Sequence, residues 1–170
     1  MALITSPTGV PDLSSEYHTI TIDSVGQASA NTFTCHLDQP IRNVVQARLL
    51  AASIHSQVST EQCYVSIEEL DTNFNDRASN VLGGQSEMTV VRNSFASLIV
   101  NETSHTGGTD SLITFKDSDY PIVTQYIDPI RSIDRFKVTI RDQDGNTIKN
   151  PATSANNFLV IRFVCRKPNL

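Results

Sequence analysis

The chain has 170 residues, which is enough for one domain that buries roughly 70% of the surface of its extended form. Charged residues make up 18% of the sequence and the formal net charge is −5, without any basic run interleaved with aromatic residues. Sequence-specific nucleic-acid binding is therefore not expected, because phosphate contacts need a concentrated basic face. A membrane span, which needs roughly 18 consecutive apolar residues, is not expected either.

The first part of the chain is predicted to be an arm. Residues 1–15 contain Pro7, Gly9 and Pro11 and little that could be buried, so we expect a flexible arm that is ordered only where it docks on a neighbour. The segment has neither the basic start nor the apolar run of a secretory signal. Residues 16–170 are predicted to form a single domain.

Strand-like alternation begins directly after this arm. Apolar residues alternate with polar ones in residues 16–22 and again in 32–37, and a turn around Gly26 separates the two runs. We expect these two runs to pair as a hairpin. Pro40 breaks the pattern, and residues 44–54 then form a long apolar run for which a strand is favoured over a helix.

The middle of the chain alternates less regularly. Residues 62–68 form a clean strand pattern, whereas 71–93 show no periodicity and are expected to be a long loop. Further short strands are predicted over 94–100 and 112–115, and another over 120–127, which Asp128 and Pro129 would end.

The most regular pattern lies between Ile133 and Cys165. Two runs, 133–141 and 157–165, flank the turn sequence 142–146, where Asp-Gly and Gly-Asn accept the backbone angles of a tight reversal. We expect the second run to return beside the first as a hairpin. The second run is apolar on both faces, which predicts a central strand or one that meets a partner on its second face.

These segments add up to eight substantial strands and one small one, without a convincing helix. Many short strands separated by turn signals predict an all-β fold, an antiparallel β-sandwich. Long connections between some consecutive strands favour the eight-stranded single jelly roll within this class.

The three cysteines, Cys35, Cys63 and Cys165, each lie on the apolar face of a predicted strand. Their odd number and wide spacing predict free, buried thiols and synthesis in a reducing compartment.

Candidate sites for chemistry are weak. His18, His36, His55 and His105 lie on separate segments and none of them has zinc-ligand spacing. The turn 142–146 resembles the start of a calcium loop but lacks the distal Glu and the flanking helices of an EF-hand.

Acidic and glycine-rich motifs are equally weak. Residues 104–110 contain two glycines but lack the Lys-Ser/Thr ending of a phosphate-binding loop. The acid pairs Glu68–Glu69 and Asp117/Asp119 suit a solvated surface better than a glycosidase cleft. We therefore predict no catalytic, cofactor-binding or metal site, no cofactor and no enzyme activity. A domain without such a site but with a strand that is apolar on both faces is typical of a structural subunit that packs against other molecules.

The layout, and above all the final third of the sequence, resembles a known family. The residues that carry the resemblance are 17–22 and 33–37, Tyr126-Ile-Asp-Pro-Ile130, the run 133–146 and Asn157-Phe-Leu-Val-Ile-Arg-Phe163. They resemble single jelly-roll capsid proteins, especially the penton (vertex) type, of large icosahedral double-stranded DNA viruses and virophages with double jelly-roll major capsid proteins.

This resemblance implies a structural role in the virion. Five copies would ring a five-fold vertex as a homopentamer between trimers of the major capsid protein, after synthesis in the host cytoplasm. The same fold also serves as minor or cement capsid proteins, and a carbohydrate-binding jelly-roll module is a further alternative.

Ring closure needs two different flanks of the subunit that fit each other. Residues 1–75 hold Arg42 and Arg48 against eight acidic residues, a net −6, so the remainder carries +1 and the two parts could supply such flanks.

Overall fold

The computed structural model describes residues 14–57, 60–71, 94–99, 110–148 and 155–167, and within these ranges it contains strands and no helix. The strands are β1 (Ser15–Asp23), β2 (Thr32–Gln57), β3 (Gln62–Ile67), β4 (Ala96–Ile99), β5 (Asp110–Lys116), β6 (Ile122–Asp142) and β7 (Phe158–Arg166). Every strand pairing is antiparallel. The predicted all-β class is confirmed.

The two longest strands, β2 and β6, change partners along their length. The strand order is β1-β7-β2-β6-β3-β4, with β5 paired to β2. Residues 32–36 of β2 pair with β6, residues 44–53 with β7, and residues 51–57 with β5. The second half of β6 pairs with β3. The hydrogen-bonded sheet therefore curls from one layer into a second.

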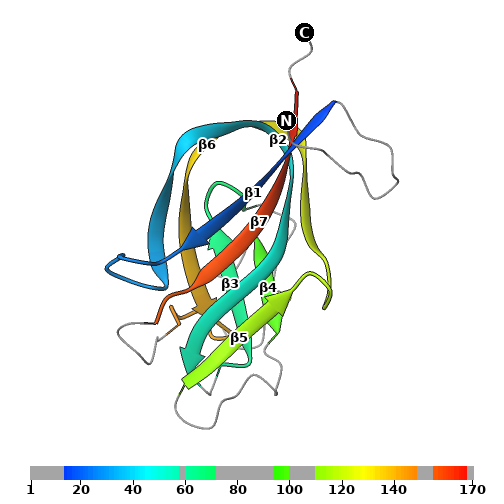
Figure 1. The fold of residues 1–170 in the computed structure, drawn as a ribbon. Coiled ribbons are helices and arrows are strands. Elements are labelled where there is room, and N and C mark those ends of the chain that lie inside the picture. Colours follow the sequence, from blue (N-terminus) through cyan, green and yellow to red (C-terminus); the bar gives the residue numbers. More distant parts are fainter. Residues whose placement is uncertain (1–13, 58–59, 72–93, 100–109, 149–154, 168–170) are drawn as a thin grey trace, which may run out of the picture.

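The pairings divide the strands into two layers. The front sheet consists of β1, β7, residues 44–57 of β2, residues 122–125 of β6, and β5; the back sheet consists of residues 32–36 of β2, residues 135–142 of β6, β3 and β4. Figure 1 shows β1, β7 and β5 in front of β3 and β4. This arrangement confirms the predicted antiparallel β-sandwich of the jelly-roll type.

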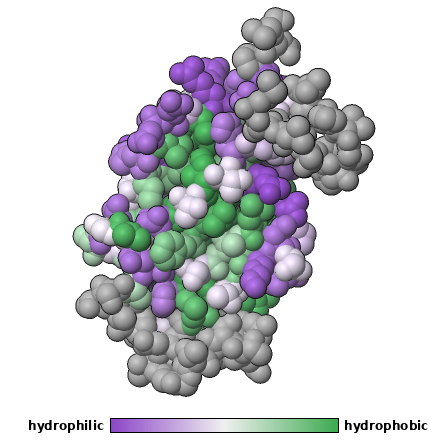
Figure 2. Space-filling model, viewed as in Figure 1, coloured by the Kyte–Doolittle hydropathy of each residue, from purple (hydrophilic) through white to green (hydrophobic). Residues whose placement is uncertain are grey.

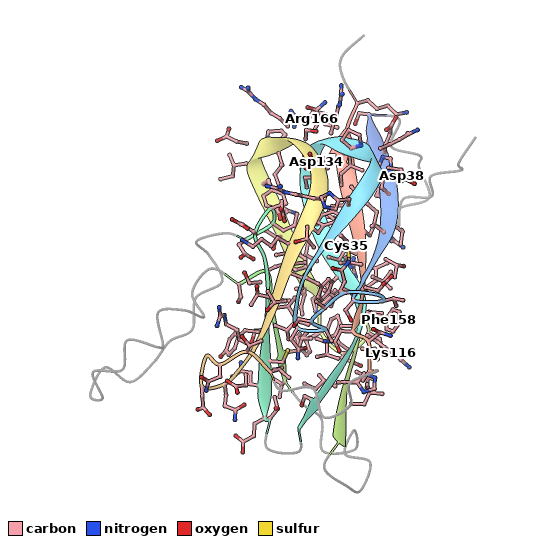
Figure 3. All side chains as sticks on the ribbon, turned by 90° about the vertical axis from the view of Figure 1, so that its left-hand side faces the viewer. Cys35, Asp38, Lys116, Asp134, Phe158 and Arg166 are labelled. Carbon is pink, nitrogen blue, oxygen red and sulfur yellow. The ribbon has the colours of Figure 1, made fainter. Side chains whose placement is uncertain are left out.

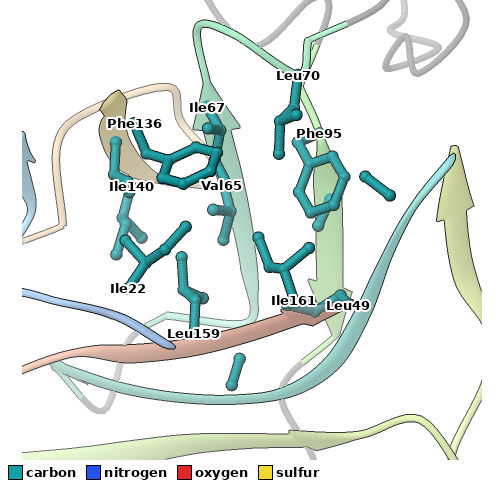
Figure 4. Close-up of a cluster of buried hydrophobic side chains, with 14 of the residues drawn as sticks. Ile22, Leu49, Val65, Ile67, Leu70, Phe95, Phe136, Ile140, Leu159 and Ile161 are labelled. Carbon is teal, nitrogen blue, oxygen red and sulfur yellow. The ribbon is translucent and has the colours of Figure 1, made fainter. Parts of the chain in front are cut away.

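The core lies between the two sheets. Ile22, Leu159 and Ile161 of the front sheet face Phe136 and Val65 of the back sheet (Figure 4), and all five are fully buried. Phe136 also stacks on Phe163 of β7, with ring centroids 5.5 Å apart. Burying one side chain of this size stabilises a fold by roughly 1.5–3 kcal/mol. The apolar residues of the alternating pattern are the ones that point inward, so their burial holds the two layers together.

Both predicted hairpins are wrong. β1 pairs with β7, and the start of β2 pairs with β6 instead of β1. The turn at 142–146 does reverse the chain, but it closes only a short bridge between Arg141 and Thr147. β7 then joins the front sheet while the second half of β6 stays in the back sheet, because each strand buries its apolar face against the opposite layer.

Neither predicted proline break ends a strand. β2 runs through Pro40 and β6 runs through Pro129. The β2–β6 pairing is interrupted between His36 and Ile41, and again between Val44, which pairs with Ile130, and Gln46, which pairs with Gln125. Both prolines therefore lie outside the paired positions, where the missing N–H removes no sheet hydrogen bond.

Several predictions fall wholly or largely outside the described residues. These are the arm apart from Ser14 and Ser15, the loop after Asp71, and the glycine-containing turn at 104–110. Ser15 is the first residue of β1, and the Ser14 carbonyl accepts a hydrogen bond from Lys167 N at 2.9 Å. Among the described residues there is no helix of the length and apolarity that membrane crossing requires.

Candidate interaction surface

The outer face of the front sheet is centred on β7. Phe158 is 40% exposed there, and Val160 and Val164 are half-buried in rows with the neighbouring strands. Hydroxyl-bearing and small side chains flank them: Val160 lies opposite Thr21 on one side and Ala51 on the other. Figure 2 shows apolar surface across the middle of this face with hydrophilic residues around it. We call this surface the front face.

Two arginines cross the middle of the front face. Arg48 of β2 and Arg162 of β7 lie directly opposite each other. Arg48 binds Asp117 through two hydrogen bonds, with Nε 2.8 Å from Oδ1, and this contact raises the pKa of the guanidinium. Exposed Arg162 forms no hydrogen bond or ion pair with the other residues that the structure describes. Among the described residues, Arg162 is therefore an unpaired cation inside an apolar and hydroxyl surround.

The outer face of the back sheet is different because its charges are paired. Lys137 Nζ lies 2.9 Å from Glu68 Oε2, and Arg135 Nε lies 3.7 Å from Glu69 Oε1. The hydrogen bond from Lys137 lowers the pKa of Glu68. Exposed pairs of this kind favour a solvated surface. The front face is thus the better candidate for contact with another molecule.

The charge asymmetry along the sequence does not produce two separate flanks in these sheets. Glu68 and Glu69 belong to the acidic first part of the chain, but they pair with Lys137 and Arg135 from the later part. Arg48 of the first part similarly pairs with Asp117 of the later part. Antiparallel pairing interleaves the two halves, so these opposite charges neutralise each other within one molecule.

An open groove of about 310 Å³ lies at the end of the front face where β7 ends. β2, β6 and β7 each contribute to its lining, which consists of Val45, Gln46, Gln125, Tyr126, Ile127, Val164 and Arg166. Ile127 is 91% exposed, whereas the Tyr126 hydroxyl donates a hydrogen bond to the Leu70 carbonyl at 2.9 Å. The tyrosine ring is thereby held in place beside a fully solvated isoleucine.

The histidines are not brought together. His18 lies 3.6 Å from Glu16, while His36 and His55 lie at different positions along β2. His105 lies outside the described residues. Within the described ranges, no three His, Cys, Asp or Glu side chains gather as metal ligands would.

The acidic motifs serve the turns in which they lie. Asp142 Oδ1 accepts hydrogen bonds from the backbone N–H groups of Asp144 and Asn146 at 3.0 and 2.9 Å, and Gly145 adopts φ +83°. The sequence prediction of a tight turn at this position is confirmed. Asp119 Oδ2 similarly accepts from Lys116 N at 2.9 Å, so Asp117 and Asp119 have separate structural partners.

All three cysteines are free, as predicted. Cys63 and Cys165 are buried, and burial raises the pKa of the Cys165 thiol to about 11. Cys35 is only half-buried, and its thiol donates to the Asp23 carbonyl at 3.0 Å. Raised pKa values keep the thiols protonated near neutral pH, where they behave as small hydrophobic groups.

A buried polar cluster at the opposite end of β7 was missed from sequence. Asn157 is fully buried; its side-chain amide donates to Ala30 O and Asn31 Oδ1 at 2.9 and 2.7 Å, and its carbonyl accepts from His55 N at 2.8 Å. Its position just before an apolar run was the one available signal. The cluster fixes the entry to β7 relative to β2.

Asp71 forms a second polar contact that no sequence pattern indicated. Its carboxylate accepts hydrogen bonds from the Ser66 hydroxyl and from Ile67 N, the latter at 2.9 Å. Burial nevertheless raises its pKa to about 6, against the lowering effect of those hydrogen bonds. The residue closes the turn that follows β3.

Comparisons with known proteins give little beyond this geometry. No protein-family model matches the sequence, and no curated protein matches it. The chain has a weak structural similarity to the infectious bursal disease virus VP2 subviral particle, with a TM-score of 0.33 and 12% sequence identity. That match covers 98% of this chain, which spans 37% of the VP2 chain.

Proposed function

We propose that this chain is a structural capsid protein and that its role is that of a penton, the five-fold vertex building block of an icosahedral double-stranded DNA virus shell. The observation that carries the proposal is the front face, an apolar and hydroxyl surface on a jelly-roll sandwich whose opposite face carries two ion pairs. The resemblance of the final third of the sequence to penton-type proteins supports the finer assignment. The proposed role is non-enzymatic and needs no cofactor.

Ring closure explains how such a face would be used. In a ring of five, one surface of each copy meets a different surface of the next, and the rotation closes the ring. The front face would form one side of that contact and bury Phe158, Val160 and Val164. The rim of the ring would then meet trimers of the major capsid protein in the virion.

The mass of the purified chain in solution tests this proposal. A pentamer of the 18.7 kDa chain would have a mass of about 94 kDa, measured by light scattering, and negative-stain images would show five-fold rings. A chain that remains an 18.7 kDa monomer, both alone and when mixed with major capsid protein trimers, would contradict the penton assignment.

A further inference from the structure

The groove at the β7 end of the front face has the features of a peptide-binding site. Valine, tyrosine and isoleucine side chains give it apolar walls, and its volume is at the lower end of the roughly 300–1,000 Å³ of ligand sites. Gln46 and Gln125 lie opposite each other across β2 and β6. Neither side-chain amide forms a hydrogen bond with another described residue, so both amides can bind the peptide groups of an extended segment.

The chain itself supplies a segment that starts beside this groove. Ser15 pairs with Arg166, which lines the groove, and the Ser14 carbonyl binds Lys167 N. Figure 3 shows Arg166 at that end of the molecule. Thirteen residues precede Ser14. They include Leu3, Ile4, Val10 and Leu13, and their one charged side chain is that of Asp12.

We propose that the N-terminal segment, residues 1–13, binds in this groove of its own chain, with apolar side chains against Tyr126 and Ile127 and Asp12 beside Arg166. Thirteen residues can span up to roughly 45 Å. The groove begins one strand from β1 and ends three strands away, which is about 14 Å at roughly 4.8 Å per strand. The segment is long enough to turn back and reach it.

The covalent connection of segment 1–13 to β1 favours binding to the groove of the same chain over binding to the groove of a second copy. A segment joined by a short linker has an effective concentration in the roughly millimolar range, above the concentration of separate copies in a dilute solution. Arg166 forms no hydrogen bond or ion pair with another described residue. Asp12 supplies the opposite charge and precedes by only three residues Ser15, which pairs with Arg166. This inference does not depend on the proposed capsid role, because the contact forms within a monomer.

Photo-crosslinking of the full-length chain tests the proposal. Benzoylphenylalanine replaces Ile127 in one variant and Ile99 in the control; these residues are 91% and 69% exposed, and Ile99 ends β4 of the back sheet. After irradiation, digestion before aspartate separates residues 1–11 from the rest of the chain. The Ile127 probe is expected to attach to residues 1–13 within one chain, and the Ile99 probe is not.

A second measurement uses smaller changes at the same two positions. Thermolysin cleaves before the apolar residues of segment 1–13, and Ile127→Asp should raise that cleavage rate about fivefold or more, because cleavage follows the undocked population. Ile99→Asp should leave the rate unchanged. Adducts that join two copies, an absence of adducts to residues 1–13, or equal cleavage rates in both variants would overturn the proposal.

Discussion

Asn157 shows how one buried polar side chain can hold separate segments of a β-sandwich together. Its amide satisfies the Ala30 carbonyl and the Asn31 side chain, and its carbonyl oxygen satisfies His55 N–H. Its own N–H donates to the Ser24 hydroxyl at 2.9 Å. A substitution that removes the side chain would leave the Ala30 carbonyl, the Asn31 side chain and the His55 N–H without this hydrogen-bond partner, and each buried polar group left unpaired lowers the stability of the fold.

Asn157→Ala is expected to lower the free energy of unfolding by about 3 kcal/mol, since each buried polar group left unsatisfied costs roughly 1–3 kcal/mol. The neighbouring Asn156→Ala is the control, because Asn156 is only half-buried and makes one 3.5 Å contact with Ser24. Urea denaturation of both variants measures the difference. Equal losses in the two variants would show that the Asn157 cluster does not stabilise the fold.

Asp71 makes the stability depend on pH. Its pKa of about 6 in the folded chain lies above the usual 3.8, so folding favours the protonated form. The contribution of this group is fully present below the usual pKa and is lost as the pH rises through about 6. The parent chain should therefore become less stable relative to Asp71→Asn between pH 5 and pH 7.5.

The comparison requires denaturation curves of the parent chain and of Asp71→Asn at several pH values. Asparagine retains an oxygen that can accept from Ile67 N–H and has no charge to lose. Parallel curves for the two proteins across this pH range would contradict a raised pKa at Asp71.

At the scale of elements, alternation in the sequence was sufficient to locate strands. All nine segments with strand patterns overlap strands, although two pairs of them run together as β2 and β6. The partners of each strand could not be predicted, because β1 pairs with a strand more than a hundred residues away. Prolines misled the prediction for a physical reason: Pro40 and Pro129 lie where the sheet ladder is already interrupted.

The interaction surface was predictable in part. The two-sided apolar pattern of 157–165 predicted a second contact face on β7, and Phe158 and Val160 do lie on the outer side of the sheet. The groove could not be predicted, because Gln46, Ile127 and Val164 come from three strands that only the topology brings together.

Two phenylalanines on different strands allow the contribution to folding stability to be measured separately from the contribution to association. Phe136 of β6 is fully buried and stacks on Phe163, whereas Phe158 of β7 is 40% exposed on the front face. Phe136→Ala should lower the free energy of unfolding by roughly 3–5 kcal/mol. Phe158→Ala should cost less than about 1 kcal/mol and should weaken association of the chain, because it removes apolar contact area.

Chemical denaturation and analytical ultracentrifugation measure these two effects separately. If Phe158→Ala destabilised the monomer as much as Phe136→Ala and left association unchanged, the front face would not be a contact surface.

At the scale of the whole molecule, the difference between the two outer faces is the basis of the functional proposal. The outer face of the back sheet carries two ion pairs, which Lys137 and Arg135 form with acidic residues, so these charges are already paired when the face is in water. The front face presents β7 and its neighbours, with Arg162 unpaired among the described residues. A sandwich with one solvated face and one apolar face is suited to side-by-side packing of copies.

Two threonines allow a matched test of this asymmetry. Thr21 of β1 lies opposite Val160 on the front face, and Thr32 of β2 lies opposite Thr139 on the outer face of the back sheet. Thr21 and Thr32 are both exposed strand residues. A new carboxylate at either position should change the monomer's free energy of unfolding by no more than about 0.5 kcal/mol. Only the carboxylate on the front face would be desolvated in a contact between copies.

The most direct measurement is therefore the mass in solution, by light scattering, of Thr21→Glu and Thr32→Glu at a concentration where the parent chain assembles. Thr32→Glu should keep the parent mass, about 94 kDa for a ring of five, and Thr21→Glu should fall to the 18.7 kDa of a single chain. Loss of assembly in Thr32→Glu with full assembly in Thr21→Glu, or the same mass for both variants, would contradict the assignment of the front face as the contact between copies.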